Sequence, residues 1–236
     1  MSEIAENWQA LRLRIARAEA VADRLPGSVR LLAVSKTKPA AAVRAAHAAG
    51  QAAFGENYVQ EGVAKIAELA GLPLEWHFIG PLQSNKTRDV AEHFHWVHSV
   101  EREKIARRLA EQRPAHLPPL QICLQVNIDD EDSKAGCGLA ELPALVRTVL
   151  SLPRLELRGL MCIPRPGNTA AFTALAKTQQ DLLASIPGLS TPGLLRERFD
   201  TLSMGMSDDL EAAVAAGSTL VRIGTALFGA RDYPAP

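Results

Sequence analysis

The sequence predicts an α/β fold, a single (β/α)8 TIM barrel with an extra N-terminal helix. Short apolar runs alternate with longer amphipathic runs along almost all of the 236 residues, which is typical of parallel strands joined by helical crossovers. About eight such pairs occur, and this number in this length describes a compact barrel. A doubly wound open sheet is the main alternative, because local patterns do not show whether a sheet closes. No linker requires a second domain, so we expect one domain over residues 1–236.

Each element of the barrel has its own signal. The apolar runs predict strands over residues 30–35, 52–57, 74–80, 95–100, 121–128, 156–161, 199–205 and 219–224. The amphipathic runs predict helices over residues 39–49, 58–69, 86–94, 101–112, 139–150, 170–185 and 207–216, most with Gly or Pro near one end. Residues 1–25 have helical spacing with interspersed charges, which argues against a signal peptide or a membrane span.

Composition restricts the classes of partner. Lys plus Arg equals Asp plus Glu at 26 each, so no overall field favours nucleic acid or an anionic membrane. The three cysteines lack metal-ligand spacing, and their odd number suits reduced thiols better than a disulfide framework. We therefore expect a cytoplasmic protein with no metal site and with any anion site confined to a local pocket. A monomer is expected as well.

Lys36 directly follows the first predicted strand. Side chains alternate along a strand, so Leu32, Val34 and Lys36 share one face. Sites on this fold lie where strands end, so the Lys36 amine is expected at the barrel mouth. Lys38 has the same parity but precedes Pro39, which suits a first helical turn and makes its direction less predictable. The alternative for both lysines is a solvated loop charge.

Two Gly-containing turns follow the last two predicted strands and lead into predicted helices. In such barrels these turns often bind phosphate through backbone N–H groups and helix N-terminal dipoles. The candidate contributors are Ser203, Gly205, Ser207, Gly224 and Thr225. Ser207 precedes two aspartates, so a helix N-cap is an equally good interpretation for it. A mouth lysine together with a phosphate pocket points to pyridoxal 5'-phosphate (PLP), which offers an aldehyde and a phosphate.

Six segments together are highly specific and span almost the whole chain. They are AVSKTKP, FGENYVQE, WHFIGPLQSNK, QVNIDDEDSKAG, RGLMCIP and LSMGMSDDLEAAVAAGSTLVRIGTALFG. With them the chain resembles the PLP-binding proteins of PLP homeostasis, a family related to the N-terminal barrel of bacterial alanine racemase. The resemblance implies that Lys36 carries PLP as an internal aldimine, that the SMGMS and RIGT segments form the phosphate cup, and that Arg222 is the partner of the pyridine nitrogen.

Arg222 also supports an argument from its own chemistry. By strand parity it shares a face with Leu220 and Gly224, which predicts an inward position, although a surface arginine is the alternative. A guanidinium only donates hydrogen bonds and does not deprotonate, so opposite the ring nitrogen it would favour an unprotonated pyridine. Such a ring is a weak electron sink, which disfavours transaminase-like chemistry.

Other polar residues near strand ends are more ambiguous. Asn57 follows the second predicted strand, where its amide would reach the cofactor ring, or cap a turn or helix. His77 is a candidate for the mouth, and a hydrogen-bonded core histidine is the alternative. His93, His95 and His98 straddle a helix end and a strand with mixed parity, which argues against a shared metal.

The function expected from these features is binding of PLP and participation in intracellular PLP (vitamin B6) homeostasis. The partners would be PLP and apo PLP-dependent enzymes that receive it, without established catalytic turnover. A PLP-dependent amino-acid racemase of low activity is the alternative. It needs a second acid/base group beside the cofactor, and neither Tyr58 nor Tyr233 is a convincing candidate. A third reading is an aldolase-like barrel in which Lys36 attacks a phosphorylated sugar directly.

Overall fold

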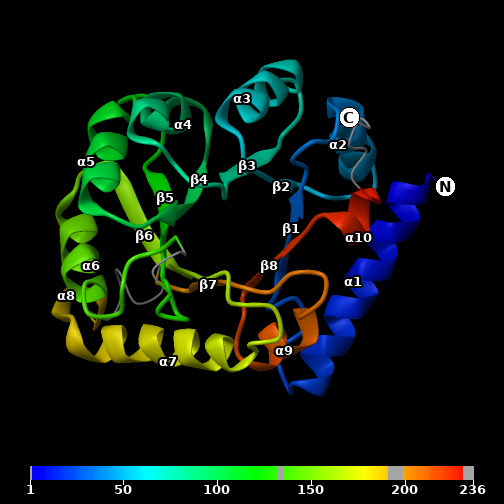
Figure 1. Ribbon diagram of the computed structural model, residues 1–236. Coiled ribbons are helices and arrows are strands. Elements are labelled where there is room, and N and C mark those ends of the chain that lie inside the picture. The colour runs from blue at the N-terminus through cyan, green and yellow to red at the C-terminus, as the bar shows by residue number, and fades with distance from the viewer. Residues whose placement is uncertain (1, 132–134, 191–198, 231–236) are drawn as a thin grey trace.

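Eight parallel strands form a closed barrel in the order β1 to β8 (Figure 1). The computed structural model describes residues 2–131, 135–190 and 199–230. The strands are β1 Arg30–Val34, β2 Ala53–Glu56, β3 Glu75–Phe78, β4 Trp96–Val100, β5 Leu120–Gln125, β6 Leu155–Met161, β7 Thr201–Ser203 and β8 Leu220–Ile223. All eight predicted strands are confirmed. Pairing of β1 with β8, with Leu32 opposite Arg222, closes the sheet and decides against the open alternative.

Helices surround the barrel and follow the strands in alternation (Figure 1). They are α1 Glu3–Val21, α2 Ala40–Ala48, α3 Val59–Glu68, α4 Thr87–His93, α5 Glu103–Gln112, α6 Leu142–Ser151, α7 Ala170–Ser185, α8 Pro187–Ser190, α9 Leu210–Ala215 and α10 Thr225–Phe228, with a 3-10 turn η1 at Ser84–Lys86. The sequence did not predict α8 or η1 and gave no bounds for the helix after β8, because a single turn is too short to show helical periodicity. None of the described helices has a stretch long and apolar enough to cross a membrane.

The barrel strands bury both faces, as parallel sheets do. Leu31 and Ala33 belong to the large core between the barrel and its helices. Leu32 and Val34 point into the barrel and form a separate apolar cluster there with residues of β2 and β8 and with Ile79, which follows β3. The alternation that placed Leu32 and Val34 on one face is therefore confirmed.

Polar side chains fill much of the rest of the barrel interior. His77 of β3, His98 of β4, Ser203 of β7 and Arg222 of β8 are all buried, and the first three have no exposed surface. The Trp96 ring stacks on His77 with their centroids 5.2 Å apart. An interior of this kind departs from the layers of branched apolar side chains that dominate such barrels, and it requires that the polar atoms find partners inside.

The three cysteines are buried and none forms a disulfide. Burial raises the pKa of all three thiols, to about 12 for Cys137 and Cys162 and further for Cys123. A protonated, enclosed thiol is a poor nucleophile, and the free thiols agree with the reduced cysteines expected from the sequence.

Candidate functional site

Lys36 lies at the barrel mouth, in the turn that follows β1. It is half-buried, and it lines one small pocket together with Lys38 and the Gly224–Thr225 turn that follows β8. The Lys38 ammonium donates to the carbonyl of Ala230 over 2.5 Å. The closure of the barrel thus brings together two segments almost 190 residues apart in the sequence, the first lysine turn and the last glycine turn.

A buried ionic cluster holds the turn that carries Lys36. The Lys65 ammonium donates to the Ser35 carbonyl at 2.6 Å, to Glu56 Oε1 at 2.8 Å and to Glu61 Oε1 at 2.6 Å. Ser35 Oγ donates to the same Glu56 oxygen at 2.6 Å. Both neighbours of the lysine are anchored, because the Thr37 N–H also donates to Glu61.

The ionic cluster stabilises an unfavourable backbone conformation at Thr37. The sequence did not predict this cluster. Thr37 adopts a left-handed conformation with φ of 64°, which is uncommon for a β-branched residue. Burial raises the pKa of Glu56, and the nearby Lys65 charge opposes that rise. The one local signal was the spacing of Glu61 and Lys65, four residues apart on a predicted helix. This spacing gave no indication that the two side chains bond the backbone of the turn after β1.

The turns after β7 and β8 present unused backbone donors. Within the described part of the chain, the N–H groups of Gly205, Ser207, Gly224 and Thr225 donate no hydrogen bond. Gly205 has φ of +96°, and its carbonyl accepts from the Arg222 N–H of β8 at 2.9 Å. Free N–H groups that project from two adjacent turns are suited to an anion.

Ser207 does not cap a helix. α9 begins at Leu210, and its N-cap is Asp209, whose Oδ1 accepts from the Met206 N–H at 2.6 Å. The N-cap interpretation of Ser207 is therefore wrong, and the helix is shorter than the predicted 207–216. Residues 207–209 form a turn before α9, and the half-buried Ser207 in this turn is available to a ligand.

Replacing Gly205 with alanine is expected to lower the free energy of unfolding by roughly 1–3 kcal/mol. The added Cβ would lie 2.5 Å from the Ala213 Cβ, in a backbone conformation that side chains rarely adopt. Urea denaturation measures the loss. Gly71→Ala is the matched control, because a Cβ there meets nothing within 4 Å and its φ is unexceptional. Equal stability of the two variants would contradict the steric argument.

Arg222 points into the barrel, as strand parity predicted. Its side chain donates from Nη1 to the Ser203 carbonyl at 2.5 Å and to Ser203 Oγ at 2.9 Å, and from Nη2 to the Cys162 carbonyl at 2.9 Å. Its hydrogen-bond acceptors in the described structure are neutral oxygens; burial lowers the pKa of the guanidinium, and the charge of Asp209 opposes that shift. The Nε hydrogen and one Nη2 hydrogen donate no hydrogen bond in the described structure. This buried cation can therefore donate to a neutral acceptor of a ligand.

Asn57 follows β2 and has an unpaired oxygen. Its side-chain Oδ1 is buried and has no hydrogen-bond partner in the described structure. α3 begins one residue later than a cap at Asn57 would require, with Tyr58 as its N-cap and no side-chain cap bond. The helix-capping alternative is therefore wrong, and an orphaned amide oxygen of this kind suits a ligand that donates to it.

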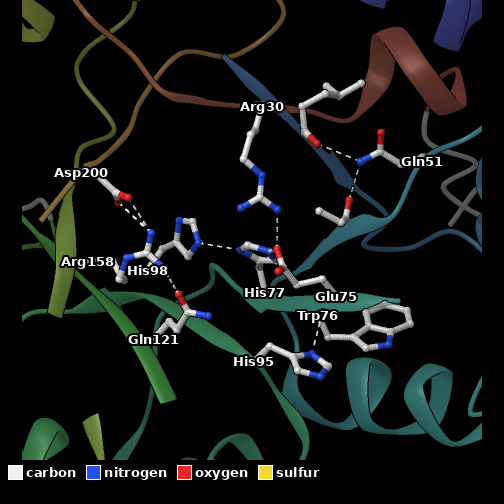
Figure 2. Close-up of polar contacts among 12 residues, drawn as sticks. Arg30, Gln51, Glu75, Trp76, His77, His95, His98, Gln121, Arg158 and Asp200 are labelled. Atoms are coloured by element: carbon white, nitrogen blue, oxygen red, sulfur yellow. Dashed lines mark hydrogen bonds and ion pairs between the residues drawn. The ribbon is translucent and has the colours of Figure 1, made fainter. Parts of the chain in front are cut away.

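Two of the predicted contact residues lie inside the barrel. His77 bonds Glu75 through Nε2 and His98 through Nδ1, and it has no exposed surface (Figure 2). It is a hydrogen-bonded core histidine, the alternative considered above. The Ser203 hydroxyl is engaged by His98 and Arg222. Neither side chain is therefore a direct contact at the mouth, because the polar atoms of both are bonded to partners inside the barrel. Tyr233, the second tyrosine considered, lies outside the described residues.

Fold and site together define a class of protein: a (β/α)8 barrel with a lysine after β1, glycine turns after β7 and β8, and a buried arginine on β8. Residues 3–232 match the family described as alanine racemase, N-terminal domain. The alanine racemase of Corynebacterium glutamicum shares the fold, with a TM-score of 0.69 over 96% of this chain and 61% of that chain at 16% identity.

Similarity is much higher to smaller proteins that consist of this barrel. The chain is 62% identical to the pyridoxal phosphate homeostasis protein of Pseudomonas aeruginosa, over 100% of this chain and 99% of that protein. It is 55% identical to that of Escherichia coli K12, over 99% of each. The structure of PipY from Synechococcus elongatus with PLP bound has a TM-score of 0.81 and 42% identity, over 96% of this chain and 100% of that one. The chain belongs to the pyridoxal phosphate homeostasis protein family.

Proposed function

We propose that this protein binds PLP at the barrel mouth and takes part in PLP homeostasis. The observation that carries the proposal is the pocket shared by Lys36 and the Gly224–Thr225 turn, with unused N–H donors beside it. Relatives named for PLP homeostasis, and PipY solved with PLP bound, support it.

Bound PLP would supply a reactive aldehyde and a phosphate dianion. Lys36 Nζ, once deprotonated, would bond the aldehyde carbon, and the carbonyl oxygen would leave as water. The N–H groups of Gly205, Ser207, Gly224 and Thr225 would donate to the phosphate oxygens. The pocket thus offers an amine for the aldehyde and backbone N–H groups for the phosphate, the two functional groups of the ligand.

Two further residues would hold the pyridine ring. Arg222 would donate from its unused N–H groups to the ring nitrogen, and a cation at that position keeps a proton off the nitrogen. Asn57 Oδ1 would accept a hydrogen bond from the ligand, since it has no hydrogen-bond partner among the described residues. An unprotonated ring withdraws electrons weakly, so this arrangement favours holding the cofactor over carbanion chemistry on a bound amino acid.

The role that follows is that of a carrier. Lys36 is half-buried in an open mouth, where an incoming amine could displace its Nζ from the cofactor and take the cofactor away. Apo PLP-dependent enzymes with a lysine of their own are the proposed recipients, and the proposed acting form is a cytoplasmic monomer.

Titration of the purified protein with PLP tests the proposal. We expect a near-visible absorbance band, and borohydride reduction followed by peptide mapping should locate one cofactor on Lys36. Pyridoxine 5'-phosphate, which has the phosphate but no aldehyde, should compete without producing the band. A protein that stays colourless with PLP, or a reduced label on Lys38 alone, would contradict the proposed site.

A further inference from the structure

A continuous chain of hydrogen bonds crosses the inside of the barrel. It starts at the N-terminal end of the strands, where the Arg30 guanidinium donates to Glu75 Oε1 at 2.6 Å and His77 Nε2 lies 2.6 Å from the same oxygen (Figure 2). His77 Nδ1 lies 2.9 Å from His98 Nε2, and His98 Nδ1 lies 2.8 Å from Ser203 Oγ. The last link is the 2.9 Å bond from Arg222 to that hydroxyl.

The hydrogen-bond partners allow only one donor and one acceptor at each link of this series. The Glu75 carboxylate only accepts, so His77 Nε2 carries a hydrogen and its Nδ1 accepts. His98 Nε2 must then donate to His77, which leaves His98 Nδ1 as the acceptor for the Ser203 hydroxyl. The Ser203 oxygen can then receive the Arg222 N–H. Each link donates toward Glu75, so a buried cation and a carboxylate are joined through neutral groups.

The charges around the two imidazoles agree with that order. Burial raises the pKa of Glu75, but its contacts with His77 and Arg30 outweigh this and lower the pKa to about 2. Burial lowers the pKa of His77, which faces Glu75, Arg30 and His95 besides His98. His77 is therefore neutral near pH 7, and the same holds for His98, whose pKa is also lowered.

His98 is fully buried, as His77 is. Burial lowers its pKa well below the usual value, and the neighbouring His77, Arg222 and Arg30 lower it further. No carboxylate contacts it in the described structure. A neutral imidazole has one donor nitrogen and one acceptor nitrogen. It can therefore connect two hydrogen bonds that run in the same direction.

We propose that His77, His98 and Ser203 form a positioning relay that connects Arg222 to Glu75 and thereby sets the orientation and donor strength of Arg222 toward the cofactor ring. The proposal rests on the proposed function. In the described structure the Arg222 side chain donates hydrogen bonds only to neutral oxygens, and Asp209 is the carboxylate whose charge acts on it directly. The relay links Arg222 in addition to a second carboxylate, that of Glu75, whose side chain is 33% exposed at the far end of the barrel. Hydrogen bonds in a chain polarise one another, so a change at Glu75 is felt at Ser203.

The first test needs no cofactor. Nitrogen-15 NMR of the histidine side chains should show the Nε2–H tautomer for both His77 and His98 between pH 6 and 8. Glu75→Gln should disturb both tautomers, because the glutamine amide can donate to His77 and reverse the chain. Asp200→Asn is the matched control, since Asp200 pairs with Arg158 in the same part of the protein and takes no part in the chain. An Nδ1–H tautomer in the unmodified protein, or a His98 signal unmoved by Glu75→Gln, would overturn the relay.

The second test uses PLP labelled with nitrogen-15 in the ring. In the unmodified protein the ring nitrogen should stay unprotonated from pH 6 to 9. His98→Leu should raise its protonation midpoint by about one pH unit or more, because Arg222 loses the oriented Ser203 acceptor. If His98→Leu does not fold, the Glu75→Gln protein carries the test, and its ring signal should differ from that of Asp200→Asn. A protein that binds no PLP contradicts the proposed function, whereas bound PLP with an unchanged ring signal in these variants overturns the relay alone.

Discussion

The Lys36→Ala protein is expected to yield no borohydride-fixed PLP and no near-visible band at PLP concentrations that saturate the unmodified protein. Covalent retention requires an amine within bonding distance of the aldehyde, and the proposed pocket offers that amine from the turn after β1. The N–H donors of the two glycine turns are unaffected by the substitution, so we expect residual binding of PLP as a phosphate ester. Absorbance together with mass spectrometry of the reduced protein measures the loss.

Lys38→Ala is the control for this variant. Lys38 lines the same pocket, carries the same charge and donates to the Ala230 carbonyl. We expect it to keep the band and one fixed cofactor per chain. Full labelling of Lys36→Ala would show that another lysine captures PLP and would move the covalent site, whereas loss of label in both variants would indicate that pocket charge matters more than the position of the amine.

Replacing Lys65 with methionine is expected to lower the free energy of unfolding by about 3–5 kcal/mol. The side chain is 8% exposed, and its ammonium offsets the fully buried Glu56 carboxylate. Methionine has a similar length but leaves that carboxylate without a counter-ion and the Ser35 carbonyl without a donor. Urea denaturation at pH 7 measures the change. Because the same cluster anchors both neighbours of Lys36, PLP labelling should weaken as well.

Two further variants separate the buried charge from general effects of lysine removal. Lys177→Met removes one member of an exposed ion pair with Asp181 and should change stability by less than about 0.5 kcal/mol. Adding Glu56→Gln to Lys65→Met should restore part of the lost stability, because the carboxylate that lacks a counter-ion is then neutral. Equal losses in Lys65→Met and Lys177→Met would show that the cluster contributes little.

Much of the fold could be predicted from periodicity. Each strand alternates or is continuously apolar over at least three residues, and each long helix repeats its apolar positions, so both patterns lie within a short window of sequence. The same alternation placed Leu32, Val34 and Arg222 inside the barrel. It could not place the short α10 or the true start of α9, since one or two turns of helix depend on tertiary contacts more than on local pattern.

The site was predictable where a residue follows a strand and less so where a side chain has to find a distant partner. Lys36 and the glycine turns follow strand ends, and those ends meet at one face of a barrel. His77 and Ser203 have the same kind of sequence context, yet the structure commits their polar atoms to partners inside the barrel. The alternation along a strand predicts which face of the sheet a side chain lies on. It does not predict how far that side chain lies from the mouth of the barrel.

By itself, the sequence determined the order of strands and helices, the inward face of each strand and the chemical groups at the mouth. Tertiary structure alone decided that the sheet closes, that Lys65 reaches beneath the turn of Lys36, and that His77 and His98 join Glu75 to Arg222. The physical reason is that hydrogen bonds and buried charges are satisfied by whichever groups the fold brings within about 3 Å. Those groups lie tens to more than a hundred residues apart, beyond the range of any local pattern.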